Sequence, residues 1–179
     1  MGDGEVRRGF FIGRFQPFHL GHLKAVEYIL DREDEIIIGI GSAQYSHTME
    51  NPLTAGERIE MIHRTLRAAG VDLARCYIIP IPDIGEHKLW VSRVELFCPS
   101  FQTAYSNNGL VQLLLEERGY KVEPIPFFNR EVYVATEIRQ RMLNGGYWRD
   151  LVHEATYDYL VNTVRIESRL RSLTRVDKR

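Results

Sequence analysis

Short apolar runs alternate along this chain with longer segments that carry apolar side chains three and four positions apart. The runs have the length and composition of buried strands, and they cover residues 9–12, 35–41, 76–81, 103–106 and 120–125. The segments between them have the spacing of amphipathic helices, and they cover residues 23–30, 54–70, 90–97 and 108–118. Parallel strands joined by helices make right-handed crossovers and are covered on both faces. The pattern therefore predicts an α/β fold with a doubly wound, five-stranded parallel sheet.

The last part of the chain is expected to be helical. Thr136 is expected to cap a helix that the glycine pair at 145–146 ends, and residues 151–173 have the spacing of one or two amphipathic helices. A chain of 179 residues, 44% of them hydrophobic, suffices for one packed core and is short for two. We therefore expect residues 1–179 to form a single domain, with a C-terminal helical extension over about 147–179.

Charge and cysteine content narrow the class of ligand and the compartment. The formal net charge is -1 and the pI is near 6.6, so no overall positive field is available to bind nucleic acid, and a small anionic ligand is favoured. Two cysteines without a secretory pattern indicate a reducing compartment, which predicts a cytoplasmic protein. No apolar run approaches the roughly 20 residues of a membrane helix. The arginine-rich stretch 165–179 is read as a solvated helix face and tail rather than as a contact with a polyphosphate or a partner.

Residues 13–22 have the features of a phosphate-binding turn. They connect the first expected strand to the first expected helix and contain Gly13, Arg14, His19, Gly21 and His22. A helix start offers unpaired N–H groups and a positive dipole end, and a glycine there lets an anion approach the backbone. Two imidazoles and a guanidinium add donors with charge assistance. The turn is therefore predicted to bind phosphate.

A zinc site is the alternative for the same histidines, because His-x-x-His can supply two ligands. The remaining histidines are scattered, and Cys76 and Cys98 stand alone in apolar surroundings. No metal-binding cluster of protein side chains is expected.

Residues 13–22, Gly-Arg-Phe-Gln-Pro-Phe-His-Leu-Gly-His, resemble the His-x-Gly-His signature of nucleotidyltransferases, and in their longer form they resemble the archaeal nicotinamide mononucleotide adenylyltransferases. The resemblance extends over nearly the whole chain, through residues 40–47, 51–58, 89–91 and 136–139. It implies a Rossmann-like nucleotidyltransferase fold and the reaction of ATP with nicotinamide mononucleotide (NMN) to give NAD and pyrophosphate. It also implies Mg²⁺ held mainly by ATP phosphates, and assembly as a hexamer.

The same resemblance implies roles for individual residues. His19 and His22 would contact ATP phosphates, Arg139 would bind the β- and γ-phosphates, and Trp90 would stack on nicotinamide. With Arg14, the two histidines and Arg139 form the expected catalytic set. The residues expected to bind substrate are Gly13, Gly21, Ser42, Trp90, Asn107 and Thr136. Because the NMN phosphate is already largely ionised, its second pKa being near ~6, positioning and charge stabilisation are required rather than a general base.

Several residues also have plainer interpretations. Trp90 could be a core aromatic, Arg139 a surface arginine and Asn107 part of a helix-capping turn. Other enzymes of this type transfer a nucleotidyl group to pantetheine phosphate, flavin mononucleotide or a phosphorylated alcohol, and Trp90 favours a pyridine ring over these. A nucleotide-binding sensor without turnover is the remaining alternative, and the presence of His22 and Arg139 argues against it.

Overall fold

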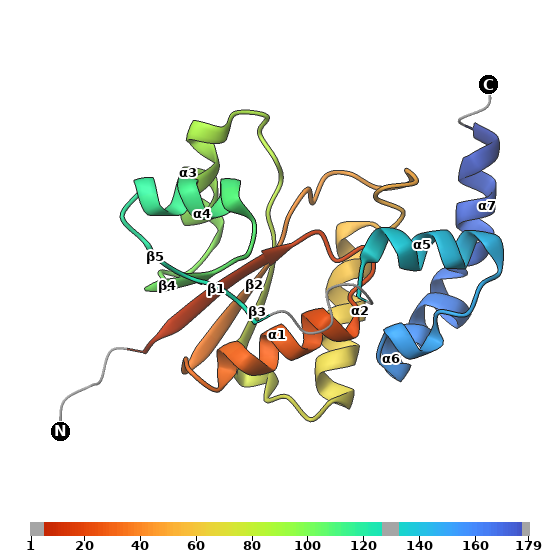
Figure 1. The fold of residues 1–179 in the computed structure, drawn as a ribbon, viewed down its shortest axis with the longest axis horizontal. Coiled ribbons are helices and arrows are strands. Elements are labelled where there is room, and N and C mark those ends of the chain that lie inside the picture. Colours follow the sequence, from red (N-terminus) through yellow and green to blue (C-terminus); the bar gives the residue numbers. More distant parts are fainter. Residues whose placement is uncertain (1–5, 127–132, 177–179) are drawn as a thin grey trace.

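A computed structural model describes residues 6–126 and 133–176 and contains one parallel sheet (Figure 1). Its strands are β1 (Arg8–Gly13), β2 (Glu35–Ile40), β3 (Cys76–Pro80), β4 (Thr103–Tyr105) and β5 (Lys121–Glu123), in the spatial order β3-β2-β1-β4-β5. All four strand pairs are parallel. The predicted doubly wound, five-stranded sheet is thus confirmed.

Helices follow the strands as the sequence pattern predicts, and further helices form the C-terminal part. They are α1 (Leu20–Leu30), α2 (Ala55–Ala68), α3 (His87–Phe97), α4 (Gly109–Glu117), α5 (Ala135–Asn144), α6 (Glu154–Asp158) and α7 (Ile166–Val176). Short 3₁₀ turns cover Leu73–Arg75 and Arg149–Leu151, and a π-helical turn covers Tyr159–Val164. In the described chain, no helix is long and apolar enough to cross a membrane.

The central strands bury both faces, because successive side chains of a strand point to opposite sides of the sheet. On β1, Phe11 packs in the cluster that also contains Ile36, Ile38 and residues of α1 and α2. Its neighbour Phe10 packs in the other cluster, with Ile37 and residues of α3 and α4. Helices therefore cover the two faces as Figure 1 shows, with α1 and α2 on one side and α3 and α4 on the other.

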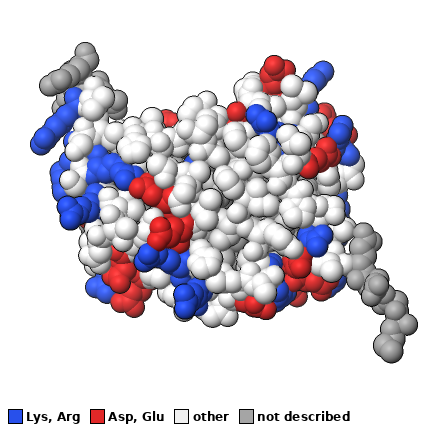
Figure 2. All heavy atoms as spheres, turned by 180° about the vertical axis from the view of Figure 1, so that it is seen from behind, with Lys and Arg blue, Asp and Glu red and all other residues white. Residues whose placement is uncertain are grey.

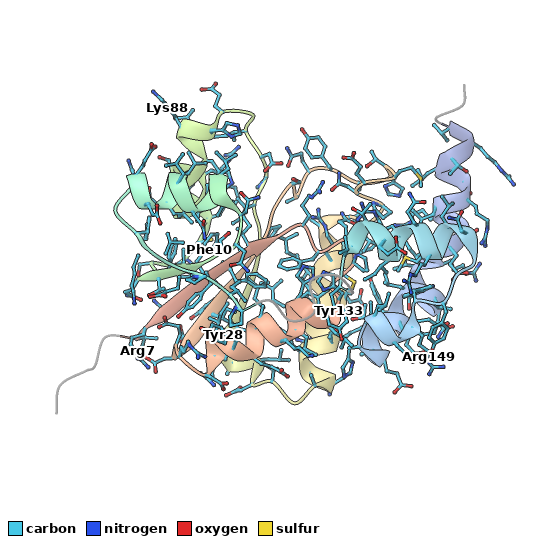
Figure 3. All side chains as sticks on the ribbon, viewed as in Figure 1. Arg7, Phe10, Tyr28, Lys88, Tyr133 and Arg149 are labelled. Carbon is cyan, nitrogen blue, oxygen red and sulfur yellow. The ribbon has the colours of Figure 1, made fainter. Side chains whose placement is uncertain are left out.

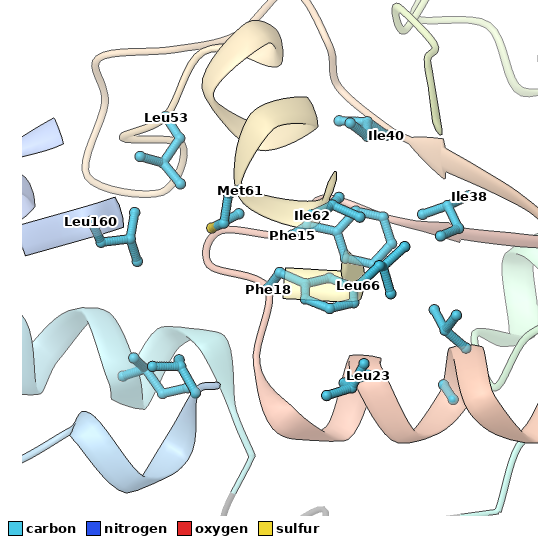
Figure 4. Close-up of a cluster of buried hydrophobic side chains, with 14 of the residues drawn as sticks. Phe15, Phe18, Leu23, Ile38, Ile40, Leu53, Met61, Ile62, Leu66 and Leu160 are labelled. Atoms are coloured by element: carbon cyan, nitrogen blue, oxygen red, sulfur yellow. The ribbon is translucent and has the colours of Figure 1, made fainter. Parts of the chain in front are cut away.

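The C-terminal helices extend the first of these clusters. Leu160 joins Leu53 and Met61 next to Phe15 and Phe18, which are 1% and 0% exposed (Figure 4). Both phenylalanines belong to the turn between β1 and α1, so their burial fixes this turn against the core. That matters for function, because the same turn carries Arg14 and His19.

Two expectations about the second half of the chain need correction. Helix α5 begins one residue before Thr136, and its N-cap is Val134, which makes no side-chain capping bond; a valine side chain has no oxygen to accept one. Strand β5 ends at Glu123 rather than at residue 125. The helical region after 151 is divided at Arg165, where φ is +56°, in agreement with the expectation of one or two helices. Residues 177–179 of the arginine-rich stretch lie outside the described residues.

Charged side chains of both signs are interspersed on the face opposite to that of Figure 1. Figure 2 shows this face, where Lys and Arg lie beside Asp and Glu toward both ends of the molecule, with a largely uncharged area between. This distribution accords with the near-zero net charge of the sequence and gives this face no extended field of one sign.

Candidate active site

Two clefts meet at the carboxyl ends of β1 and β4. Strand order reverses between these two strands, because β2 and β3 lie to one side of β1 and β5 lies beyond β4. In open α/β sheets, ligands bind in the crevice outside this point. Both clefts are lined by Ile12, Ser106 and Asn108. Two ligands, one in each cleft, could therefore approach each other at this junction.

One cleft, here called the histidine cleft, has a volume of about 380 Å³. It is lined by Phe11, Ile12, His19, Gly21, His22, Ala25, Ser106, Asn107, Asn108, Ile125, Pro126 and Tyr133. The other, here called the tryptophan cleft, has a volume of about 510 Å³. It is lined by Ile12, Gly13, Arg14, Gly41, Tyr45, Asp83, Ile84, Gly85, Glu86, His87, Trp90, Ser106, Asn108, Leu110, Val111 and Leu114.

His19 and His22 cap the start of α1 reciprocally. The backbone N–H of His22 donates to Nδ1 of His19 at 3.3 Å, and the backbone N–H of His19 donates to Nδ1 of His22 at 3.2 Å. This is the arrangement of a capping box, with imidazoles in place of the usual hydroxyl and carboxylate. The two rings stack with their centroids 3.5 Å apart. Helix α1 therefore fixes the position of both rings.

The same bonds determine which nitrogen of each ring carries the proton. Burial lowers the pKa of His19 to about 4, and burial together with the nearby His19 lowers the pKa of His22 well below its usual value. Both rings are therefore neutral at pH 7. Because each Nδ1 accepts a hydrogen bond, the remaining proton lies on Nε2. The expectation of cationic imidazoles is wrong for the ligand-free protein: the rings offer neutral Nε2–H donors.

Gly21 makes room for these rings as well as for a ligand. A Cβ at this position would lie 3.1 Å from the His19 ring and 3.1 Å from Cβ of Tyr133. The Tyr133 ring stacks beside His19 at a centroid distance of 6.1 Å, and Figure 3 shows Tyr133 between the start of α1 and α5. Sequence reasoning did not find Tyr133, because a lone tyrosine between a loop and a helix gives no signal.

Arg139 on α5 is buried and holds several elements together. Its Nη1 donates to the Gln16 carbonyl at 2.8 Å, its Nε donates to the Met49 carbonyl at 3.1 Å, and its Nη2 donates to Oγ1 of Thr136 at 3.3 Å. Burial lowers its pKa, and the charge of Arg14 adds to the effect. The interpretation of Arg139 as a surface arginine is therefore excluded. Thr136 contributes a hydroxyl that orients this guanidinium instead of capping the helix.

Arg58 is a further buried arginine that ties the turns around the site. Its guanidinium is 0% exposed and donates to backbone carbonyls only, those of Arg14, Gly41, Ser42, Ala43 and Thr54. Burial, and next the charge of Arg14, lower its pKa to about 10. The turn after β1 and the loop after β2 are thereby fixed to each other. In the sequence, Arg58 looks like an ordinary residue of the α2 helix.

Trp90 lies on α3 with one part packed on the core and another facing the tryptophan cleft. Gly13, at the end of β1, and the exposed Arg14 line the same cleft. From the sequence, Arg14 is expected in one catalytic set with the two histidines; in the structure Arg14 lines the tryptophan cleft, which adjoins the histidine cleft, and its catalytic role remains a prediction. Its charge nevertheless affects Arg139, so the two guanidinium groups lie within electrostatic range of each other.

Ser42 acts on Asp83, a cleft residue that sequence reasoning did not select. Ser42 Oγ donates to Oδ2 of Asp83 at 2.6 Å. Gln44 binds the Asp83 backbone twice, since Asp83 N–H donates to its Oε1 at 2.9 Å and its Nε2 donates to the Asp83 carbonyl at 3.0 Å. Asp83 is therefore held on the wall of the tryptophan cleft. An aspartate in a proline-containing loop looks like a turn residue in the sequence.

Asn107 and Asn108, which follow β4, both make hydrogen bonds that stabilise the fold next to the junction of the clefts. The Asn107 amide donates to the Ile125 carbonyl at 2.7 Å and accepts from the Ile125 N–H at 3.0 Å. Asn108 Oδ1 caps α4 by accepting from Leu110 and Val111. Asn107 lines the histidine cleft and Asn108 lines both clefts. Substrate contacts of Asn107 remain a prediction.

Metal ligands do not gather in the described part of the chain. In residues 6–126 and 133–176, no three His, Cys, Asp or Glu side chains form a group that could hold a metal ion.

Comparisons with known proteins show the family to which the chain is similar. The sequence model of the cytidylyltransferase-like family matches residues 10–141. The chain is 50% identical to a nicotinamide-nucleotide adenylyltransferase of Pyrococcus horikoshii, over 93% of this chain and 88% of that protein. It is 46% identical to a nicotinamide-nucleotide adenylyltransferase of Saccharolobus solfataricus, over 97% of this chain and 100% of that protein.

A solved structure from Francisella tularensis shares the fold. It is a bifunctional NMN adenylyltransferase/ADP ribose pyrophosphatase complexed with AMP and an Mn ion, with a TM-score of 0.76 and 23% sequence identity. The match covers 97% of this chain and 54% of that one, so this chain spans about half the length of the bifunctional protein.

Proposed function

The chain belongs to the cytidylyltransferase-like family and, within it, to the nicotinamide-nucleotide adenylyltransferases, and we propose that it transfers the adenylyl group of ATP to NMN. The observation that carries this proposal is the junction of the two clefts at the ends of β1 and β4. Two phosphorylated substrates, one in each cleft, would present their phosphates to each other beside Ile12 and Ser106.

ATP would occupy the histidine cleft. Its phosphates would accept hydrogen bonds from Nε2–H of His19 and of His22, which the capping box aims and which need no reorientation during the reaction. The start of α5 lacks a side-chain cap, and neither it nor Arg139 lines the histidine cleft. Its backbone N–H groups and Arg139 would therefore meet the β- and γ-phosphates where these extend beyond that cleft. The hydrogen bonds to Gln16, Met49 and Thr136 use three of the five N–H donors of Arg139, which leaves donors for a ligand.

NMN would occupy the tryptophan cleft. Its nicotinamide ring would stack on Trp90, while Gly13 and Arg14 would lie near its phosphate. Asp83, held by Ser42, offers a carboxylate to the N–H₂ group of a carboxamide, and Glu86 lines the same cleft. These two acidic residues favour the uncharged carboxamide of NMN over the carboxylate of nicotinate mononucleotide.

The chemistry is a substitution at the α-phosphorus of ATP. A phosphate oxygen of NMN forms a bond to this phosphorus while the bond to the β-phosphate oxygen breaks, and pyrophosphate leaves with the electron pair. The attacking oxygen is already ionised at pH 7, so the protein need not remove a proton. Its task is to align two anions and to stabilise the charge that builds on the α-phosphate and on the leaving group.

Four further parts of the proposal concern the metal, the assembly, the location and the domain organisation of the protein. ATP would enter as its Mg²⁺ complex, with the ion held mostly by phosphate oxygens and water; the related structure from Francisella tularensis holds AMP together with an Mn ion. A homo-hexamer and a cytoplasmic location remain predictions. A single domain over residues 1–179 also remains a prediction, supported by the hydrophobic cluster that the C-terminal helices share with α1 and α2.

A panel of acceptors tests the proposed reaction. The protein is incubated with MgATP and NMN, nicotinate mononucleotide, pantetheine phosphate or flavin mononucleotide, and pyrophosphate release is measured. Fastest release with NMN, accompanied by NAD, is the expected result. Turnover with another acceptor only would contradict the assignment of the tryptophan cleft, and nucleotide binding without turnover on any acceptor would favour a sensor.

A further inference from the structure

Helix α7 reaches back to the start of α2 through Arg169. Its Nη1 and Nη2 each donate to one carboxylate oxygen of Glu57 at 2.7 Å, and Nη1 also donates to the Pro52 carbonyl at 3.0 Å. The side chains of Arg169 and Glu57 are 20% and 22% exposed. A two-bond pair of this kind fixes direction as well as distance. Arg169 thus departs from the solvated helix face expected for residues 165–179.

Glu57 has a second task in the same contact. The Thr54 N–H donates to its Oε2 at 2.9 Å, and its own N–H donates to Oγ1 of Thr54 at 3.1 Å, which closes the capping box of α2. Burial opposes the charged form of Glu57, but the bonds from Arg169 and Thr54 outweigh it and lower the pKa of this carboxyl. Arg169 therefore holds an ionised carboxylate and the backbone just before it.

The segment held by Arg169 is the one that orients Arg139. Leu53, next to Pro52, exchanges two hydrogen bonds of 3.0 Å with the Gln16 amide, which is 2% exposed. The Gln16 carbonyl in turn accepts from Nη1 of Arg139. Met49, three residues before Pro52, provides the carbonyl that accepts from Nε of Arg139.

The loop from Met49 to Leu53 is also held by hydrogen bonds between Thr48 and Asn51. Thr48 N–H donates to the Asn51 carbonyl at 3.2 Å, and Asn51 N–H donates to Oγ1 of Thr48 at 3.0 Å. A shift at Pro52 is therefore passed on to Met49 as well as to Leu53. Both backbone carbonyls that hold the Arg139 guanidinium depend on the position of this loop.

We propose that Arg169 is a positioning residue for ATP binding: from α7 it fixes the loop 49–53, and through it the direction of the Arg139 guanidinium. This inference rests on the proposed function, in which Arg139 binds the β- and γ-phosphates. Pro52 and Glu57, the hydrogen-bond partners of the Arg169 side chain in the described part of the chain, line neither the histidine cleft nor the tryptophan cleft. Its effect should therefore fall on ATP and spare NMN.

The test compares Arg169→Met with Arg171→Met, a matched loss of one exposed arginine on the same helix. KM for ATP, KM for NMN, kcat and melting temperature are measured for both. Arg169→Met should raise KM for ATP by about 2- to 10-fold, as expected for contacts coupled through a shared network, and should leave KM for NMN within about twofold. Arg169→Lys should recover part of the loss, because it keeps the charge without the planar fork. Arg171→Met should match the parent.

Glu57→Gln provides a second variant in case Arg169→Met does not fold. Glutamine can keep the capping box of α2 but loses the charged pair with Arg169, so the same selective rise in KM for ATP is expected.

A double-mutant cycle separates positioning from general loss of stability. Combined with Arg139→Lys, Arg169→Met should cost less than the sum of the two single effects on ATP; combined with Trp90→Phe, the effects should add. An unchanged KM for ATP, an equal rise for both substrates, or additivity with Arg139→Lys would overturn the inference. If Arg139→Lys alone leaves ATP kinetics unchanged, the phosphate role of Arg139 in the proposed function fails instead.

Discussion

His19 and His22 show how one pair of side chains can serve both the fold and the site. Their Nδ1 atoms complete the start of α1, and their neutral protonation state follows from burial. What remains for a ligand is one Nε2–H from each ring, held in place before the ligand arrives. A donor that is already oriented stabilises developing charge without reorganisation. The proposed chemistry at this turn is therefore hydrogen bonding from neutral rings, supplemented by charge from nearby arginines.

His22→Ala is predicted to lower kcat by about 10²- to 10³-fold, because losing one preorganised donor to a developing oxyanion costs ~2.7–4 kcal/mol. Steady-state kinetics with MgATP and NMN measure the effect. His63→Ala, which removes an exposed histidine of α2, is the control and should behave as the parent. Near-parental turnover in folded His22→Ala would remove His22 from the catalytic set.

Trp90→Ala is predicted to raise KM for NMN by about 5- to 150-fold while KM for ATP stays within a factor of a few. Stacking of a ring on an aromatic side chain contributes roughly 1–3 kcal/mol and acts on one substrate only. Trp90→Phe should recover part of the effect, because a smaller ring still has a π-face.

Fluorescence provides an independent measurement of the same contact. Trp148 is 2% exposed in the C-terminal core, so it remains as an indole remote from solvent when Trp90 is replaced. Quenching on addition of NAD should shrink in both Trp90 variants. A large drop in melting temperature with equal losses for both substrates would identify Trp90 as a core residue instead.

The starts of α1 and α2 are built on one plan with different surroundings. Both begin with a capping box, and both carry glycine as the second helical residue, Gly21 in α1 and Gly56 in α2. A Cβ at Gly21 would press on His19 and Tyr133 at 3.1 Å, whereas a Cβ at Gly56 would meet only Oγ1 of Thr54 at 3.9 Å. The same substitution therefore tests packing at the site against helix propensity alone.

Gly21→Ala should lower kcat/KM for ATP by at least about tenfold, because the His19 ring must move, and a displaced reacting group typically costs up to 10²-fold. Gly56→Ala should leave activity unchanged and raise the free energy of unfolding by up to about 1 kcal/mol. Steady-state kinetics of both variants measure kcat/KM for ATP, and urea unfolding measures their free energies of unfolding. Unaltered ATP kinetics in Gly21→Ala would show that the cleft tolerates a shifted imidazole.

The cap of α1 should also make stability depend on pH. His19 has a pKa of about 4 in the folded protein and about 6.5 when unfolded, so the unfolded chain binds more protons in between. The contribution is fully present above about pH 6.5 and is lost as pH falls toward 4. Asparagine caps helices without titrating, so His19→Asn should lose less stability than the parent between pH 7.5 and 5, by up to about 2 kcal/mol. Parallel curves for the two proteins would contradict the neutral buried imidazole.

The sequence predicts those parts of the molecule that hydrophobic periodicity and local turn motifs determine. Continuous apolar runs such as Ile36–Ile38 predicted central strands, and the Thr54–Glu57 capping box predicted the start of α2. Residues 13–22 identified the histidine pair, because His19, Gly21 and His22 are close in the chain, whereas Ser106, Ile125 and Tyr133 on the other side of the histidine cleft are not. Trp90 needed the family resemblance, since an indole at helical spacing is equally typical of a core.

Contacts between distant segments were not predictable from these local patterns. Arg58, Asp83 and Arg169 act through partners that lie 15 or more positions away, and no spacing rule joins such residues. The cap of α5 was misread because Thr136 is a good capping residue whose hydroxyl the fold uses for Arg139. The pKa values of the histidines likewise depend on burial by the whole core, which the motif does not reveal.

A structure of the protein bound to NAD tests the central claim most directly, because NAD joins the two substrates across the junction of the clefts. The account predicts the nicotinamide ring stacked on Trp90, the adenylyl phosphate within hydrogen-bond distance of His19 and His22, and the phosphate bridge beside Ile12 and Ser106. NAD bound with its nicotinamide away from Trp90, or with its phosphates out of reach of both histidines, would contradict it.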